Sequence, residues 1–138
     1  MGEGAIPIIN SALLLESLDL AKNNIQSDIG EFIKETLSNT NSLAKLQLEY
    51  NELSALGAKE ISLGLSRNRS LLSLNLKGNG IGDQGCTYIA ASLKDCIQLR
   101  ELDLSCNNIS TPGFLAISDV LPHCGLQTLI CNRNDLND

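Results

Sequence analysis

Glu101 and Asp103 are the two residues in this sequence whose spacing comes closest to that of a catalytic acid and base. They alternate along a predicted strand, so their side chains share one face at a separation of about 7 Å. Such a separation can serve acid and base chemistry. An open sheet face has no pocket to shift either pKa, so a solvated charge pair is favoured. Asp19 lies three predicted strands away, about 14 Å, which is too far to form a dyad with Asp103.

The remaining reactive residue types do not form a catalytic or metal-binding set. His123 is the single histidine, which excludes histidine-rich metal sites, and no serine or cysteine has an evident base beside it. His123 precedes Cys124 in a predicted surface loop, where adventitious metal binding is the alternative to no role. The glycines of KGNGIGDQG lack the phosphate-loop pattern and are explained by turn geometry. We therefore expect no enzymatic activity, no cofactor and no metal.

The cysteines are odd in number and include no C-x-x-C pair, which indicates reduced thiols in an intracellular, cytoplasmic protein. They are Cys86, Cys96, Cys106, Cys124 and Cys131. A disulfide between Cys96 and Cys124 is an alternative, because both lie at similar places just before the predicted strands of adjacent repeats. No stretch approaches the roughly 18–20 apolar residues of a membrane span. The net charge of -6 opposes binding to nucleic acid or anionic membranes, although Arg67 and Arg69 form a local basic spot that could contact an acidic partner.

The elements that position these residues follow from an internal repeat. The pattern L-x-x-L-x-L-x-x-N-x-(I/L) begins at residues 15, 43, 71, 99 and 126, with Cys131 replacing the last leucine of the fifth copy. Within each copy, L-x-L has the period of a short strand. The predicted strands lie near 15–20, 43–48, 71–76, 99–104 and 126–131. The series Gly57, Ile61, Leu65 and its equivalents have helical spacing, so each unit is a strand, a turn and a returning helix.

An asparagine closes every predicted strand, and we expect these five amides to form a ladder inside the turns. They are Asn23, Asn51, Asn79, Asn107 and Asn134. An amide offers a donor group and an acceptor to turn backbone that neither strand nor helix can pair. Candidate caps for the following helices are Ser27 or Asp28, Ser54, Asp83 and Thr111.

Stacked units bury a continuous aliphatic core that one unit cannot bury alone, so the sequence predicts a single α/β solenoid domain over residues 1–138. Strands pair at about 4.8 Å, whereas helix axes need about 8–10 Å. The stack therefore curves, with a concave parallel sheet and convex helices, as a right-handed βα superhelix. Residues 1–9 align with a helix start and residues 136–138 stop before another helix, so we expect a fragment of a longer solenoid, with a complete small protein as the alternative.

At this point the sequence resembles the leucine-rich repeat family, and within it the 28-residue subtype typified by ribonuclease inhibitor. IGDQGCTYIAASL is the closest copy of the helical half of that pattern. The resemblance implies a non-enzymatic module that binds a protein partner through the concave sheet and adjacent turns. It leaves two alternatives: a regulator of a GTPase resembling the Ran GTPase-activating protein, and a structural or cytoskeletal scaffold segment resembling the tropomodulin repeat domain.

The predicted binding surface consists of residues that point outward from the strands or lie at the strand ends. The candidates are Asp19, Gln47, Glu49, Tyr50, Asn75, Lys77, Glu101, Asp103 and Arg133. Tyr50 and Arg133 are the best candidate anchors, because binding hot spots favour tyrosine and arginine. A merely solvated face is the alternative for any one of them. The last predicted strand leaves an edge, with Ile130 outward and Cys131 inward, through which the chain could self-associate.

Overall fold

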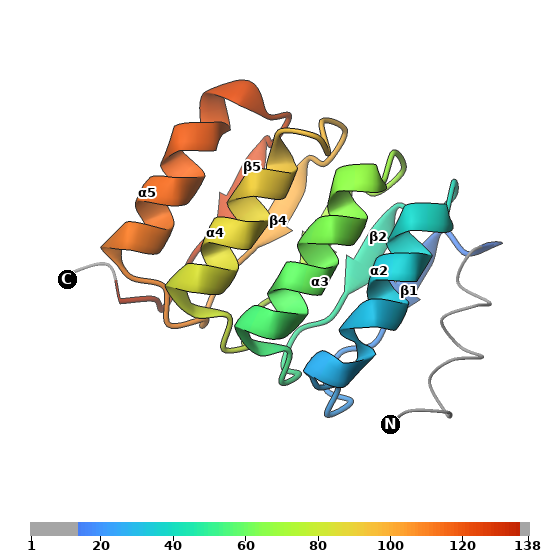
Figure 1. Cartoon of the computed structure of the whole chain (residues 1–138), viewed down its shortest axis with the longest axis horizontal. Helices are drawn as coiled ribbons and strands as arrows, with labels where there is room; N and C mark the ends of the chain where they lie inside the picture. Colours follow the sequence, from blue (N-terminus) through green and yellow to red (C-terminus); the bar gives the residue numbers. More distant parts are fainter. Residues whose placement is uncertain (1–13, 136–138) are drawn as a thin grey trace.

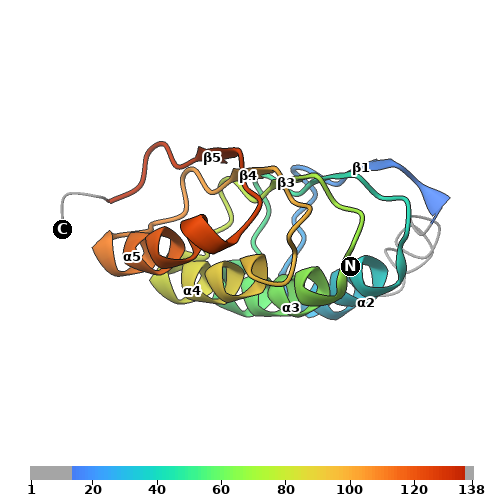
Figure 2. The ribbon, with the colours of Figure 1, turned by 90° about the horizontal axis from the view of Figure 1, so that it is seen from above.

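The computed structural model describes residues 14–135, in which strands and helices alternate as two layers (Figures 1 and 2). The strands pair in parallel in chain order: β1 (Ser17–Asp19), β2 (Lys45–Gln47), β3 (Ser73–Asn75), β4 (Glu101–Asp103) and β5 (Thr128–Ile130). The helices are α2 (Gly30–Asn39), α3 (Ser54–Arg67), α4 (Gly82–Leu93) and α5 (Thr111–Val120), with 3-10 turns η2 (Ser27–Ile29) and η3 (Leu121–His123). The predicted α/β repeat solenoid is confirmed. The alignments proposed for residues 1–9, and Leu136, lie outside the described residues.

The central leucine of each strand stands beside its counterpart in the next strand, as the repeat predicts. Leu46 pairs with Leu74, and Leu74 with Leu102, in adjacent parallel strands. Each of these three side chains is at most 2% exposed. The buried core is aliphatic and continuous across the coils, because each coil covers the leucine face of its neighbour.

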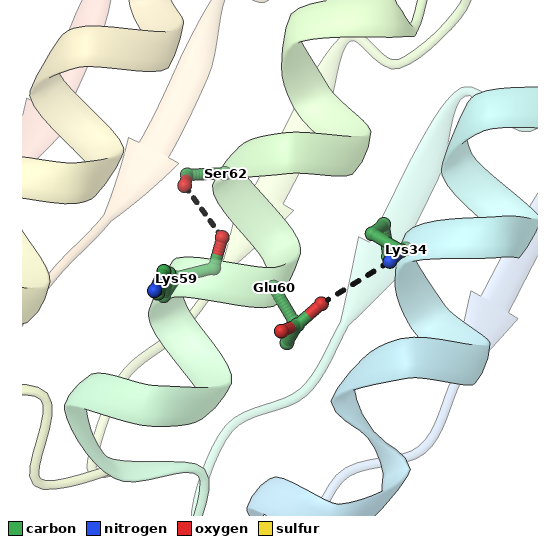
Figure 3. Close-up of polar contacts among 4 residues, drawn as sticks. All are labelled: Lys34, Lys59, Glu60 and Ser62. Atoms are coloured by element: carbon green, nitrogen blue, oxygen red, sulfur yellow. Dashed lines mark hydrogen bonds and ion pairs between the residues drawn. The ribbon is translucent and has the colours of Figure 1, made fainter.

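The helix layer is close-packed where α2 meets α3. A Cβ added to Gly64 would lie 2.9 Å from Leu37 Cβ and 3.0 Å from Lys34 Cα, so only glycine permits this approach. Lys34 Nζ reaches Glu60 Oε2 across the same contact at 3.5 Å (Figure 3). The Ser62 hydroxyl donates to the Lys59 carbonyl at 2.6 Å, which pairs a buried polar group within α3 (Figure 3).

The prediction that Ser27 or Asp28, Ser54, Asp83 and Thr111 cap the helices that follow them is wrong. No described helix accepts a hydrogen bond on its own N-cap side chain, and Thr111 is the first residue of α5 rather than its cap. Asp83 instead caps the helix of the following coil: its Oδ1 accepts the N–H groups of Ser110 at 2.7 Å and Gly113 at 3.1 Å. The Ser110 hydroxyl donates to Asp83 Oδ2 at 2.6 Å. These bonds lower the pKa of Asp83, the Ser110 hydroxyl contributing most.

Candidate interaction surface

The outer face of the sheet contains a hollow of about 210 Å³ that extends over β2 to β5. The residues that line it are Lys45, Gln47, Ser73, Leu74, Asn75, Glu101, Leu102, Asp103, Thr128 and Ile130. Four of the predicted binding residues, Gln47, Asn75, Glu101 and Asp103, therefore share one hollow, and the other five lie outside its lining. We call this set of lining residues the sheet hollow.

Three of the predicted binding residues also hold the backbone where the strands end. Asp19, Asn75 and Asp103 each accept, through Oδ1, the N–H group two residues ahead, at 2.9, 3.0 and 2.9 Å respectively. Such turns are a regular use of Asp and Asn side chains. The sequence-based prediction gave these residues a binding role alone, although Asp and Asn at equivalent strand ends were the available signal for the turn.

The residue four positions after the central leucine of each strand has a left-handed backbone in every coil. The φ angles are 57° at Lys22, 56° at Tyr50, 70° at Gly78, 56° at Cys106 and 54° at Arg133. Each of the first four donates its N–H group to the next coil: Lys22 to the Glu49 carbonyl, Tyr50 to Lys77, Gly78 to Ser105 and Cys106 to Asn132, at 2.8–3.0 Å. These inter-coil bonds hold a conformation that non-glycine residues seldom adopt.

The Tyr50 side chain is partly exposed, yet residues of the two neighbouring coils lie against its ring. Tyr50 is 45% exposed, and Lys77 Nζ lies 5.5 Å and Lys22 Nζ 5.9 Å from the centre of its ring. A Cβ at Gly78 would lie 2.6 Å from Tyr50 Cδ1, so the missing side chain leaves room for the ring. Interaction with the Tyr50 side chain raises the pKa of Lys77. Of the two predicted anchors, Tyr50 is thus held in place, while Arg133 is an exposed residue in the turn after β5.

The asparagine ladder is present, and its three central amides are buried. Asn107, at 0% exposure, donates to the carbonyls of Leu76, Leu104 and Ser105 and accepts the N–H groups of Asn79 and Ile81. Asn51 and Asn79 make similar sets of bonds across two coils, and Asn134 does so from a partly buried position.

The first amide of the ladder departs from the prediction. Asn23 is exposed, and its Nδ2 donates to the Ala21 carbonyl of its own turn at 2.9 Å. Its backbone N–H group still donates to Asn51 Oδ1 at 2.9 Å. Asn23 is therefore not buried as predicted: it is the exposed end of the described ladder, and its local bond is like the one that Asn107 makes to the Ser105 carbonyl.

The turns that precede the strands contain a second set of bonds that the repeat pattern did not predict. Asn68, 1% exposed, accepts the N–H groups of Ser70 and Leu71 and donates to the Leu37 carbonyl of the previous coil at 2.9 Å. Thr40 occupies the equivalent position, and its hydroxyl oxygen accepts the equivalent N–H groups. The equivalent residue of the next coil is Cys96, so the residue type does not repeat and the pattern gives no signal.

The basic spot predicted near these turns is partly occupied. The Arg69 guanidinium donates to the carbonyls of Ser66 and Asn68 at 3.3 and 2.9 Å, and to that of Asp95 at 3.5 Å. Arg67, at the end of α3, is exposed. Arg69 therefore stabilises the turn through its own hydrogen bonds, and contact of this spot with an acidic partner stays a prediction.

The five thiols are free in the structure, including Cys96 and Cys124. Burial raises the pKa of Cys86 to about 12 and that of Cys131 to about 11, which disfavours the nucleophilic thiolate at neutral pH. No group of three or more metal-ligating side chains occurs among residues 14–135. Within the same residues, no helix is both long and apolar enough to cross a bilayer.

The edge predicted at the last strand is present in the described sheet, where β5 pairs with β4 on one side. Ile130 points outward and is 40% exposed, while Cys131 is partly buried. An apolar hollow of about 410 Å³ lies beside this strand, lined by Leu129 and by residues of α5 and η3, among them Phe114 and Leu121. Self-association through this edge stays a prediction.

The parallel sheet is covered by helices on one face, with a leucine ladder in the core and an asparagine ladder in the turns. These features are those of a leucine-rich solenoid. A leucine-rich repeat family model matches residues 13–34, 67–90 and 96–118, which together make up half of the chain. The chain belongs to the leucine-rich repeat family. A comparison with curated proteins finds no match.

Two solved structures are similar to the chain over most of its length. Leiomodin-1 actin-binding site 2 superposes with a TM-score of 0.80 at 19% identity, covering 94% of this chain and 78% of that chain. The tropomodulin C-terminal domain of Caenorhabditis elegans gives a TM-score of 0.79 at 13% identity, covering 94% of this chain and 81% of that chain. At these identities the similarity shows the fold.

Proposed function

We propose that this protein is a non-enzymatic module that binds a partner protein through the sheet hollow and the adjacent strand-end turns. The observation that carries the proposal is the convergence of outward polar side chains from four strands on one hollow. Their strands are fixed by a continuous hydrogen-bonded ladder within the sheet and by a buried aliphatic core behind it. A rigid surface of this kind loses little backbone entropy when it binds.

The composition of the hollow favours binding over catalysis. Glu101 is exposed and Asp103 already accepts the Ser105 N–H group, so this carboxylate pair has no enclosed pocket. Lys45 on β2 and Glu101 on β4 instead offer charges of both signs to a partner. Such charges contribute to orientation and specificity.

A charge-reversal experiment tests the surface. Lys45→Glu and Glu101→Lys are expected to weaken capture of partner proteins from a cell extract, because both residues line the hollow and are exposed. Lys94→Glu, at the end of α4 on the other layer, is the matched control for a reversed lysine. Equal capture by all three variants, with unchanged circular dichroism, would contradict the proposed surface.

Actin is a second candidate partner, because the similar leiomodin-1 structure is that of an actin-binding site. A cytoskeletal role for this chain would agree with the scaffold alternative that the repeat pattern left open. Co-sedimentation with actin filaments, together with gel filtration in the presence of monomeric actin, tests the proposal. Binding in either assay would support it, and recovery of the protein free in both would contradict it.

A further inference from the structure

We propose that Lys22, Tyr50, Lys77 and Gly78, here called the Tyr50 cluster, form a docking point for an acidic peptide segment of the partner. This inference rests on the proposed protein-binding function and adds the chemistry of one contact. The cluster lies where the strands end, and its members come from three successive coils.

Two cations of the Tyr50 cluster lie against one exposed ring. Lys22 Nζ is 5.9 Å and Lys77 Nζ 5.5 Å from the centre of the ring of Tyr50, a residue that is 45% exposed. Among residues 14–135, the one ion pair within 4 Å joins Lys34 to Glu60, so no carboxylate of the described residues neutralises either cluster lysine at that distance. Two ammonium groups without a carboxylate in ion-pair contact thus lie beside an exposed tyrosine, although the charge of Asp103 still acts on Lys77.

The fold holds the Tyr50 cluster in place before any ligand arrives. The Lys22 N–H group donates to the Glu49 carbonyl at 2.9 Å, and the Tyr50 N–H group donates to the Lys77 carbonyl at 2.8 Å. Tyr50 has a left-handed backbone at φ 56°, and Gly78 leaves the space that the ring fills. Preorganisation of this kind reduces the entropy lost on binding.

The charge of the whole chain selects a short acidic peptide as the ligand. The protein carries a net charge of -6, which opposes an extended polyanion such as nucleic acid or an anionic membrane. A short acidic peptide needs only a local positive spot. In an extended segment, acidic side chains at alternate positions point to one face, which offers two carboxylates to the two ammonium groups. The aliphatic part of the segment can then lie on the Tyr50 ring.

The probe is an octapeptide of alternating glutamate and serine, titrated into the whole ¹⁵N-labelled chain at low salt. We expect chemical-shift changes centred on the backbone of Lys22, Tyr50 and Lys77, and none with the same peptide carrying glutamine for glutamate. Lys22→Gln and Lys77→Gln should each weaken binding about threefold to fivefold, whereas the control Lys94→Gln leaves it unchanged. Tyr50→Leu should weaken it by a similar factor while keeping both charges.

Any of three results with the peptide would overturn the proposal: no shift changes at the cluster, equal affinity for the glutamine peptide, or full affinity in the double variant Lys22→Gln and Lys77→Gln. Inorganic phosphate separates a peptide from a small anion, and shifts of equal size with phosphate at matched charge would also overturn it. If the peptide does not bind, while Lys45→Glu still weakens capture of partner proteins, only this inference is rejected. Retained capture in Lys45→Glu and Glu101→Lys would reject the proposed function instead.

Discussion

The turns after the strands and the turns before them both contain side chains that pair backbone N–H and C=O groups. The two kinds of turn differ in how regularly the residue type of that side chain repeats. After each strand the chain uses asparagine in every coil, and the amides of Asn51, Asn79 and Asn107 are buried and bond across coils. Before each strand the equivalent position holds Thr40, then Asn68, then cysteine. Buried backbone groups therefore need a hydrogen-bond partner in both kinds of turn. The residue type of that partner repeats only in the turn after the strand.

The turn after the strand should tolerate substitution least. Asn107→Ala removes a fully buried amide that pairs two N–H groups and three carbonyls, so we expect a loss of about 3 kcal/mol in the free energy of unfolding. Urea denaturation followed by circular dichroism measures it. Asn23→Ala is the matched control, and its loss should stay below about 1 kcal/mol because this amide is exposed. Equal losses would remove the distinction between buried and exposed amides.

The turn before the strand should show a smaller effect with partial rescue. Asn68→Ala leaves the N–H groups of Ser70 and Leu71 and the Leu37 carbonyl without their partner, and we expect a loss of about 2 kcal/mol in the same assay. Asn68→Thr should recover part of that loss, because Thr40 shows that a hydroxyl oxygen accepts both equivalent N–H groups. Absence of any recovery would mean that the two positions are not interchangeable.

Asp83 is a charged side chain that caps the helix of the next coil, so its contribution to the free energy of unfolding depends on pH. Its pKa in the folded protein is lowered, chiefly by the Ser110 hydroxyl, so its stabilising contribution is complete above the unfolded pKa and is lost as pH falls through the folded pKa. Asp83→Asn should cost about 1 kcal/mol at pH 7. The difference between the two proteins should shrink below about pH 4 in thermal or urea unfolding. A difference that is constant from pH 7 to pH 3 would exclude the charged cap.

The ion pair of the helix layer should matter less than any of these turn contacts. Lys34 and Glu60 pair at 3.5 Å with side chains 21% and 32% exposed, so their coupling energy in a double-mutant cycle should be about 0.5 kcal/mol or less. Lys34→Gln, Glu60→Gln and the double variant complete the cycle. By contrast, Gly64→Ala in the same contact should destabilise more, because its Cβ would meet Lys34 Cα at 3.0 Å. A coupling energy larger than the loss in the free energy of unfolding caused by Gly64→Ala would reverse this ranking.

The sequence was sufficient for features that repeat in residue type. The leucine register, the order of strands and helices, and the central asparagine bonds all follow from a period that places like residues side by side. The left-handed row from Lys22 to Arg133 was missed because its residue types differ, although Gly78 within it was a signal. Asp83 was recognised as a cap but assigned to its own helix, because spacing along the chain does not show which neighbouring coil a side chain reaches.

The candidate binding residues were predicted less well than the fold for the same reason. Gln47, Asn75, Glu101 and Asp103 meet in one hollow because strand alternation fixes their direction. The convergence of two lysines on Tyr50 depends on a left-handed turn and on the space at Gly78, which the alternation rule does not describe.

Hydrogen exchange of the asparagine side-chain amides reports whether the coils share one enclosed interior. Two-dimensional NMR of the whole chain in D₂O would compare the Nδ2 protons of Asn107 with those of Asn23. The structure predicts strong protection at Asn107, which bonds to three carbonyls at 0% exposure, and rapid exchange at exposed Asn23. Equally rapid exchange at both residues would contradict the buried ladder and the shared core that it closes.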